Sequence, residues 1–92
     1  MTKKTFPYTN TGIGQLPNDN PALYTILTEA GKPNYIGVAE RGRLQERLKE
    51  QLGHIPGARV KIEPCASIHE ARVKETKAIA RDQPKYNKQG KE

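Results

Sequence analysis

The chain has 92 residues, of which 34% are hydrophobic and 28% are charged, so it can form one domain with a small core. Its formal net charge of +6 favours an anionic partner, with nucleic acid before an acidic membrane surface. A single cysteine excludes an internal disulfide, two histidines argue against a structural zinc site, and no signal peptide or apolar stretch of ~20 residues is visible, which predicts a cytoplasmic protein.

The N-terminal segment, residues 1–20, is mostly polar and contains several glycines, asparagines and prolines. Few apolar side chains could anchor it to a core, and these are Phe6, Tyr8, Ile13 and Leu16. We therefore predict a polar N-terminal arm, flexible in part, ahead of a folded domain that spans residues 21–92.

The domain begins with two predicted strands, residues 22–27 and 34–38, because both segments are rich in β-branched and aromatic side chains. Turn-forming residues lie between them, so we expect an antiparallel hairpin. A helix is predicted from about residue 42 to 52, where three leucines recur at every fourth position. Residues 59–63 alternate between polar and apolar side chains, which predicts a third strand.

The last predicted helix begins after Ser67, which forms a capping box with Glu70 and starts a helix to about Asp82. Helical periodicity places Glu75 in the middle of an apolar stripe made of Ile68, Ala71, Ala78 and Ile79. An ionised carboxylate there is unfavourable unless it meets a cation, a metal or hydrogen-bond donors. Periodicity alone leaves two interpretations open, a salt-bridged structural glutamate and a functional carboxylate.

Five polar residues occur in an order that resembles the GIY-YIG nuclease domain. In chain order they are Tyr24, Tyr35, Arg47, Glu75 and Asn87. The second signature of the family is present as Tyr35-Ile36-Gly37, whereas the first has Ala22 where the family usually has glycine. The resemblance covers about residues 21–89. Over this range the chain is similar to the nuclease domain of the excinuclease subunit of nucleotide excision repair.

Two further departures from the family pattern concern the predicted helix that carries Arg47. Two extra residues are inferred between Gly37 and Arg47, within the segment 40–43. One turn after the arginine, many members have histidine and others tyrosine, but this chain has Gln51. Glutamine neither takes nor gives a proton at neutral pH, so it cannot serve as a base.

The resemblance implies a small α+β fold, with a three-stranded antiparallel sheet flanked by helices, and metal-dependent hydrolysis of phosphodiesters. Glu75 would bind one divalent metal, Mg²⁺ or Mn²⁺, because a hard cation often takes only one or two carboxylates beside a substrate phosphate. Arg47 would stabilise negative charge in the transition state. We assign water activation to Tyr24 and orientation to Tyr35, with the reverse left open, and Asn87 would brace the site through its amide.

Taken alone, the same residues also have structural explanations. Arg47 could form a surface ion pair with Glu46 or Glu50, and strand tyrosines such as Tyr24 and Tyr35 commonly pack against their neighbours. These explanations stay open at this point.

The implied partner is DNA, and single-stranded and branched forms are both candidates. The basic residues expected to contact phosphates are Arg41, Arg43, Arg72, Lys74, Lys77, Arg81, Lys85 and Lys88, although some must be solvated surface. The complete catalytic set favours an endonuclease or nickase over a catalytically degenerate nucleic-acid-binding module of the same fold, and over a protein-interaction module. Little sequence lies outside the catalytic module, so we expect low sequence selectivity, or selectivity supplied by DNA structure, by a protein partner or by a homodimer.

Overall fold

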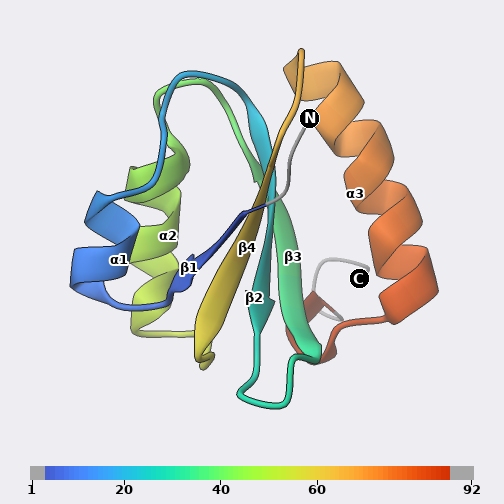
Figure 1. Cartoon of the computed structure of the whole chain (residues 1–92). Helices are drawn as coiled ribbons and strands as arrows, with labels where there is room; N and C mark the ends of the chain where they lie inside the picture. Colours follow the sequence, from blue (N-terminus) through green and yellow to red (C-terminus); the bar gives the residue numbers. More distant parts are fainter. Residues whose placement is uncertain (1–3, 88–92) are drawn as a thin grey trace.

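The β-rich segments of the sequence form one antiparallel sheet in the computed structural model, which describes residues 4–87. Its four strands have the order β1-β4-β2-β3, so β1 and β3 are the edges (Figure 1). Their bounds are β1 (Lys4–Pro7), β2 (Ala22–Leu27), β3 (Pro33–Ala39) and β4 (Arg59–Pro64). The predicted α+β fold with an antiparallel sheet is confirmed. The expected number of three strands is wrong, because β1 adds a fourth.

Three helices cover the two faces of this sheet (Figure 1). They are α1 (Asn10–Gly14), α2 (Leu44–Leu52) and α3 (Ile68–Asp82). Neighbouring side chains on β2 point to opposite faces, as the pleat of a strand requires. Tyr24 and Ile26 therefore join the core beneath α1 and α2, whereas Leu23 packs in the core beneath α3.

The segment predicted to be a separate polar arm packs onto the rest of the fold from Lys4 onward. Its first residues form β1, which pairs with β4 through Lys4 opposite Ile62 and Phe6 opposite Val60. After β1 the chain forms α1. The side chains of Tyr8 before this helix, Ile13 within it and Leu16 after it are buried in the core. The few apolar residues of the segment are thus its anchors, and the prediction of a flexible arm needs this correction.

The ends of α3 agree with the signals in the sequence. The Ser67 hydroxyl accepts a hydrogen bond from the Glu70 amide at 3.1 Å, and the Glu70 carboxylate accepts one from the Ala66 amide at 2.7 Å. The helix ends at Gln83, which has a left-handed conformation with φ of 46°, and Pro84 follows. Within residues 4–87, no helix has the length and apolar character needed to cross a membrane.

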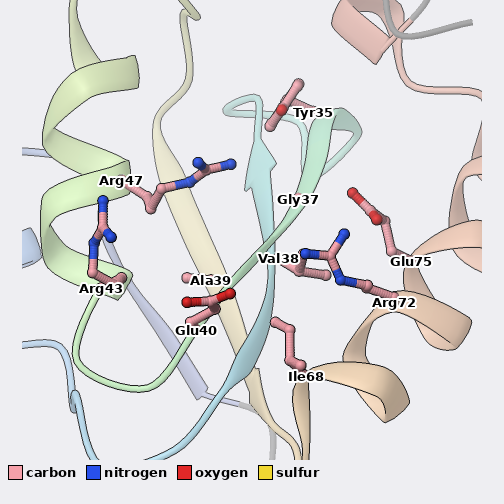
Figure 2. Close-up of a pocket in the computed structure, with 10 residues that line it drawn as sticks. All are labelled: Tyr35, Gly37, Val38, Ala39, Glu40, Arg43, Arg47, Ile68, Arg72 and Glu75. Carbon is pink, nitrogen blue, oxygen red and sulfur yellow. The ribbon is translucent and has the colours of Figure 1, made fainter.

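The edge strand β3 lies between the helices of the two layers, with α2 on one side and α3 on the other (Figure 2). In the hairpin, Tyr24 of β2 is opposite Gly37 of β3. This arrangement brings side chains from β3, α2 and α3 to a common place at the edge of the sheet, although they are distant in sequence.

Candidate active site

A pocket of about 280 Å³ opens over β3, between α2 and α3. Its strand side is formed by Tyr35, Gly37, Val38 and Ala39. The loop after β3 contributes Glu40, and the N-cap of α2 contributes Arg43. The helix α2 itself contributes Arg47, and α3 contributes Ile68, Arg72 and Glu75 (Figure 2). Three of the five predicted site residues, Tyr35, Arg47 and Glu75, therefore line one pocket.

The carboxylate of Glu75 faces this pocket from α3 and is partly buried (Figure 2). Burial raises the pKa of Glu75 above its ordinary value, and the positive charges of Arg72 and Arg47 partly oppose that effect. Glu75 forms no salt bridge with any residue that the structure describes. The carboxylate is therefore without an ion-pair partner in this part of the chain, and its role as a functional carboxylate stays a prediction.

Arg47 enters the pocket from the opposite wall, formed by α2 (Figure 2). Its Nε atom is buried and has no hydrogen-bond partner in the described part of the chain. Glu46, one of the two partners considered for Arg47, instead binds Arg43 at 2.8 Å. A buried donor without an acceptor costs about 1–3 kcal/mol, which suggests that an anion completes this site.

The pocket can accommodate a divalent metal ion with the residues present. Glu75 offers a hard oxygen ligand that forms no salt bridge within residues 4–87, and Arg47 offers an unpaired Nε donor on the facing wall. Among residues 4–87, no group of three or more histidine, cysteine or acidic side chains is placed to bind a metal. A metal here would therefore take its remaining ligands from water and from a phosphate, as Mg²⁺ commonly does.

Tyr24 lies behind the pocket and is not among the residues that line it. Its side chain is 0% exposed, and its hydroxyl donates a hydrogen bond to Oε1 of Gln51 at 3.1 Å. Burial raises the pKa of Tyr24 well above its ordinary range, and the neighbouring Tyr35 raises it further, whereas Arg47 and Gln51 act in the opposite direction. Tyr24 is therefore a neutral phenol that is shielded from water.

Gly37 lies between Tyr24 and the pocket. Because it has no side chain, the Tyr24 ring can pack directly against its backbone. A Cβ atom at this position would lie 2.6 Å from the Tyr24 hydroxyl oxygen and 3.0 Å from a ring carbon of Tyr35. Glycine thus allows the two tyrosine rings to approach, with their centroids 6.1 Å apart. Any larger residue at Gly37 would displace one of the tyrosines from its place.

Asn87 contacts the same strand from the C-terminal segment. Its amide oxygen accepts a hydrogen bond from the Ile36 backbone nitrogen at 2.8 Å, and its amide nitrogen donates one to the Ile36 carbonyl at 3.0 Å. The side chain therefore fixes the backbone between Tyr35 and Gly37, as expected of a bracing residue. Its contribution to activity stays a prediction.

The basic residues expected to contact phosphates divide into two groups. Arg43 and Arg72 line the pocket, whereas Arg41 and Lys77 are exposed outside it. Others have partners elsewhere: Lys74 binds Glu63 at 2.7 Å, Arg81 binds Asp82 at 3.0 Å, and Lys85 lies 5.5 Å from the centre of the Tyr86 ring. Lys88 lies outside the described residues.

Two features of the site escaped the sequence analysis. Glu40 lines the pocket with its carboxylate, and Gln51 binds the hydroxyl of Tyr24. The position of Glu40 directly after a strand, in the inserted loop, was a signal that could have identified it, because loops at strand ends often carry functional residues. The contact of Gln51 spans 27 residues in sequence and has no local signal.

No protein-family model matches the chain, and no curated protein matches it significantly. Its structure is similar to the crystal structure of the GIY-YIG N-terminal endonuclease domain of UvrC from Thermotoga maritima, bound to its catalytic divalent cation, magnesium. The TM-score is 0.67 and the sequences are 26% identical, over 84% of this chain and 92% of that one.

Proposed function

This chain is a GIY-YIG-like domain, and from that premise we propose that it is a metal-dependent DNA endonuclease or nickase. The observation that carries the proposal is the pair of Glu75 and Arg47 on facing walls of one pocket. Within residues 4–87 the carboxylate forms no salt bridge and the buried guanidinium nitrogen has no acceptor. A metal and a phosphate would satisfy both groups.

Glu75 is the residue of this chain that would hold the divalent cation, Mg²⁺ or Mn²⁺. When bound, such a cation supplies a Lewis acid that polarises a phosphate oxygen and neutralises charge. The similar domain of UvrC holds magnesium, which supports a divalent cation for this site. Arg47 would donate to a phosphate oxygen from the opposite side, so that its fixed positive charge stabilises the transition state.

The structure changes our preference between the two tyrosines. Tyr35 lines the pocket, where its hydroxyl would meet a water molecule beside a bound phosphate. Tyr24 is fully buried and its proton is held by Gln51, which disfavours proton transfer to or from water. We therefore propose that Tyr35 orients and activates the attacking water, and that Tyr24 supports the floor of the site from behind Gly37.

Asn87 would act indirectly, because its amide fixes the backbone of Ile36 next to Tyr35. The substrate that this mechanism requires is a DNA phosphodiester, and single-stranded and branched DNA remain the preferred candidates. A protein partner or a second copy of the chain would supply selectivity that the pocket itself lacks.

One observation favours a second function, a catalytically degenerate module that binds nucleic acid without cutting it. Gln51 replaces a group that could titrate and engages Tyr24 in a hydrogen bond without a proton acceptor that works near neutral pH. Binding would then depend on the basic residues of the pocket alone.

A cleavage assay separates the two functions. The purified protein is incubated with labelled single-stranded, duplex and branched DNA in the presence of Mg²⁺, Mn²⁺ or EDTA, and Glu75→Gln serves as the matched control. The endonuclease predicts cleavage by the wild type that requires metal and is lost in Glu75→Gln. Binding of the same DNA without cleavage under any metal condition would instead establish the degenerate module.

A further inference from the structure

The pocket extends along β3 beyond the pair of Glu75 and Arg47. At its other end, Arg43 stands on the wall formed by α2 and Arg72 on the wall formed by α3 (Figure 2). Arg43 precedes Arg47 by four residues, and Arg72 precedes Glu75 by three. Each wall therefore presents an arginine about one helical turn, or roughly 5 Å along the helix axis, before Arg47 or Glu75.

Both guanidinium groups are available to a ligand. Arg72 is exposed and its side chain makes no hydrogen bond or salt bridge within the described chain. Arg43 binds the Glu46 carboxylate through Nε at 2.8 Å and through Nη2 at 3.4 Å, but the two side chains are 51% and 56% exposed. An exposed ion pair of this kind contributes little, so a phosphate can compete for the guanidinium or bind its remaining N–H groups.

The loop between β3 and α2 adds one opposing charge. Glu40 lines the same end of the pocket, and its carbonyl accepts a hydrogen bond from the Arg43 backbone nitrogen at 2.9 Å. This bond fixes the loop backbone at Glu40, whose carboxylate lies in the pocket (Figure 2). Because Glu46 already binds Arg43, the positive charge that attracts an anion is chiefly that of Arg72, and the Glu40 carboxylate limits how tightly the anion binds.

We propose that Arg43 and Arg72 form a second phosphate subsite, which binds the DNA phosphate next to the one that is cleaved. The inference rests on the proposed function, because the first phosphate is defined by Arg47 and Glu75. The step of one helical turn between the two pairs is similar to the spacing of successive phosphates along one DNA strand. The strand would therefore run along β3, held from both walls, and each contact would be with the backbone rather than with a base.

The test uses fluorescein-labelled single-stranded DNA with one methylphosphonate linkage, in which a methyl group replaces a charged phosphate oxygen. In the wild type, one of the two bonds next to the neutral linkage should be cut about tenfold less than the same bond in an all-phosphate strand. The double variant Arg43→Ala/Arg72→Ala should cut all bonds more slowly and show no additional loss next to the methylphosphonate, as a thermodynamic cycle requires.

The matched control is Lys32→Ala/Lys49→Ala, which removes two exposed positive charges that do not line this pocket. It should retain the full methylphosphonate effect. Glu40→Gln should lower KM, because it removes the opposing charge from the subsite. The proposal is overturned if the neutral linkage slows the Arg43→Ala/Arg72→Ala variant as much as the wild type, or if Glu40→Gln weakens binding.

A wild type that cuts none of the strands would defeat the proposed function but would still leave the subsite testable. Binding of the all-phosphate strand is then measured by fluorescence anisotropy at several salt concentrations. Loss of one phosphate contact should reduce the slope of log Kd against log salt by about 0.7 in Arg43→Ala/Arg72→Ala relative to Lys32→Ala/Lys49→Ala. Equal slopes in the two double variants would overturn the subsite.

Discussion

The hydroxyl of Tyr24 donates its proton to the side-chain oxygen of Gln51, 3.1 Å away and 27 residues along the chain. An amide oxygen can accept this bond but cannot take the proton at neutral pH. Burial keeps Tyr24 neutral by raising its pKa, although the hydrogen bond to Gln51 acts in the opposite direction. Proton transfer in the pocket must then involve side chains that line it, and Tyr35 is the tyrosine among them.

The first prediction separates the two tyrosines. Tyr35→Phe should lower kcat by roughly 10²-fold or more, because it removes the phenol that faces the attacking water. Tyr24→Phe should retain most of the activity and lower the free energy of unfolding by about 1 kcal/mol, since it leaves the Gln51 oxygen without its donor. Steady-state kinetics and thermal unfolding of the two variants test this, and a greater loss of kcat in Tyr24→Phe would restore Tyr24 as the base.

The second prediction concerns charge in the transition state. Arg47→Lys keeps the positive charge but loses the planar fork, so kcat should fall by about 10²-fold while the fold is retained. The exposed Lys49 on the same helix provides the control, and Lys49→Ala should leave kcat within about twofold of the wild type. Similar small effects of both substitutions would mean that Arg47 is not at the reaction centre.

The third prediction tests Glu75 as the metal ligand without relying on cleavage. Mg²⁺ or Mn²⁺ should raise the Tm of the wild type, because a ligand that binds the folded state stabilises it. Glu75→Gln keeps the size of the side chain and should abolish this shift, and EDTA should return the wild type to its metal-free Tm. An equal metal-induced shift in Glu75→Gln would place the cation elsewhere.

The fourth prediction follows from Tyr8, whose hydroxyl donates to the Ile55 carbonyl at 2.9 Å. Burial raises the pKa of Tyr8 from 10.0 to about 12. Because the pKa is higher in the folded state, the stabilisation from the neutral phenol is complete below pH 10 and is lost as the pH rises through 12.

Chemical denaturation between pH 9 and 12 tests this sign. The free energy of unfolding of the wild type should fall over that range. Tyr8→Phe should be less stable at pH 9, because the Ile55 carbonyl loses its donor, yet its stability should fall less steeply with pH. Parallel curves for the two proteins would show that Tyr8 does not contribute to the alkaline loss of stability.

Local patterns in the sequence located most of the secondary structure. The strand at residues 22–27 and the helix from Ile68 to Asp82 have the bounds that composition and capping predicted. Such signals depend only on neighbouring residues, so they can be read without knowledge of the tertiary structure. The burial of Tyr8 depends instead on the distant segment around Ile55, so no local pattern could reveal that the N-terminal residues belong to the core.

The candidate site, too, could be predicted from the sequence only in part. The order of Tyr35, Arg47 and Glu75 in the sequence was enough to propose that they meet, and the structure places them around one pocket. The environment of Tyr24 could not be anticipated, because it depends on the strand register that sets the tyrosine against Gly37 and on Gln51 from another layer. Side-chain roles that depend on burial need the tertiary structure.

The amide of Asn87 pairs with both backbone groups of Ile36, as the backbone of a neighbouring strand would. An edge strand with free N–H and C=O groups is a template for association with other chains. Asn87 therefore does more than support Tyr35: it closes the position at which a second molecule could add to the sheet. Asn87→Ala should expose that position and make the protein prone to self-association through β3, a tendency that sedimentation velocity would detect.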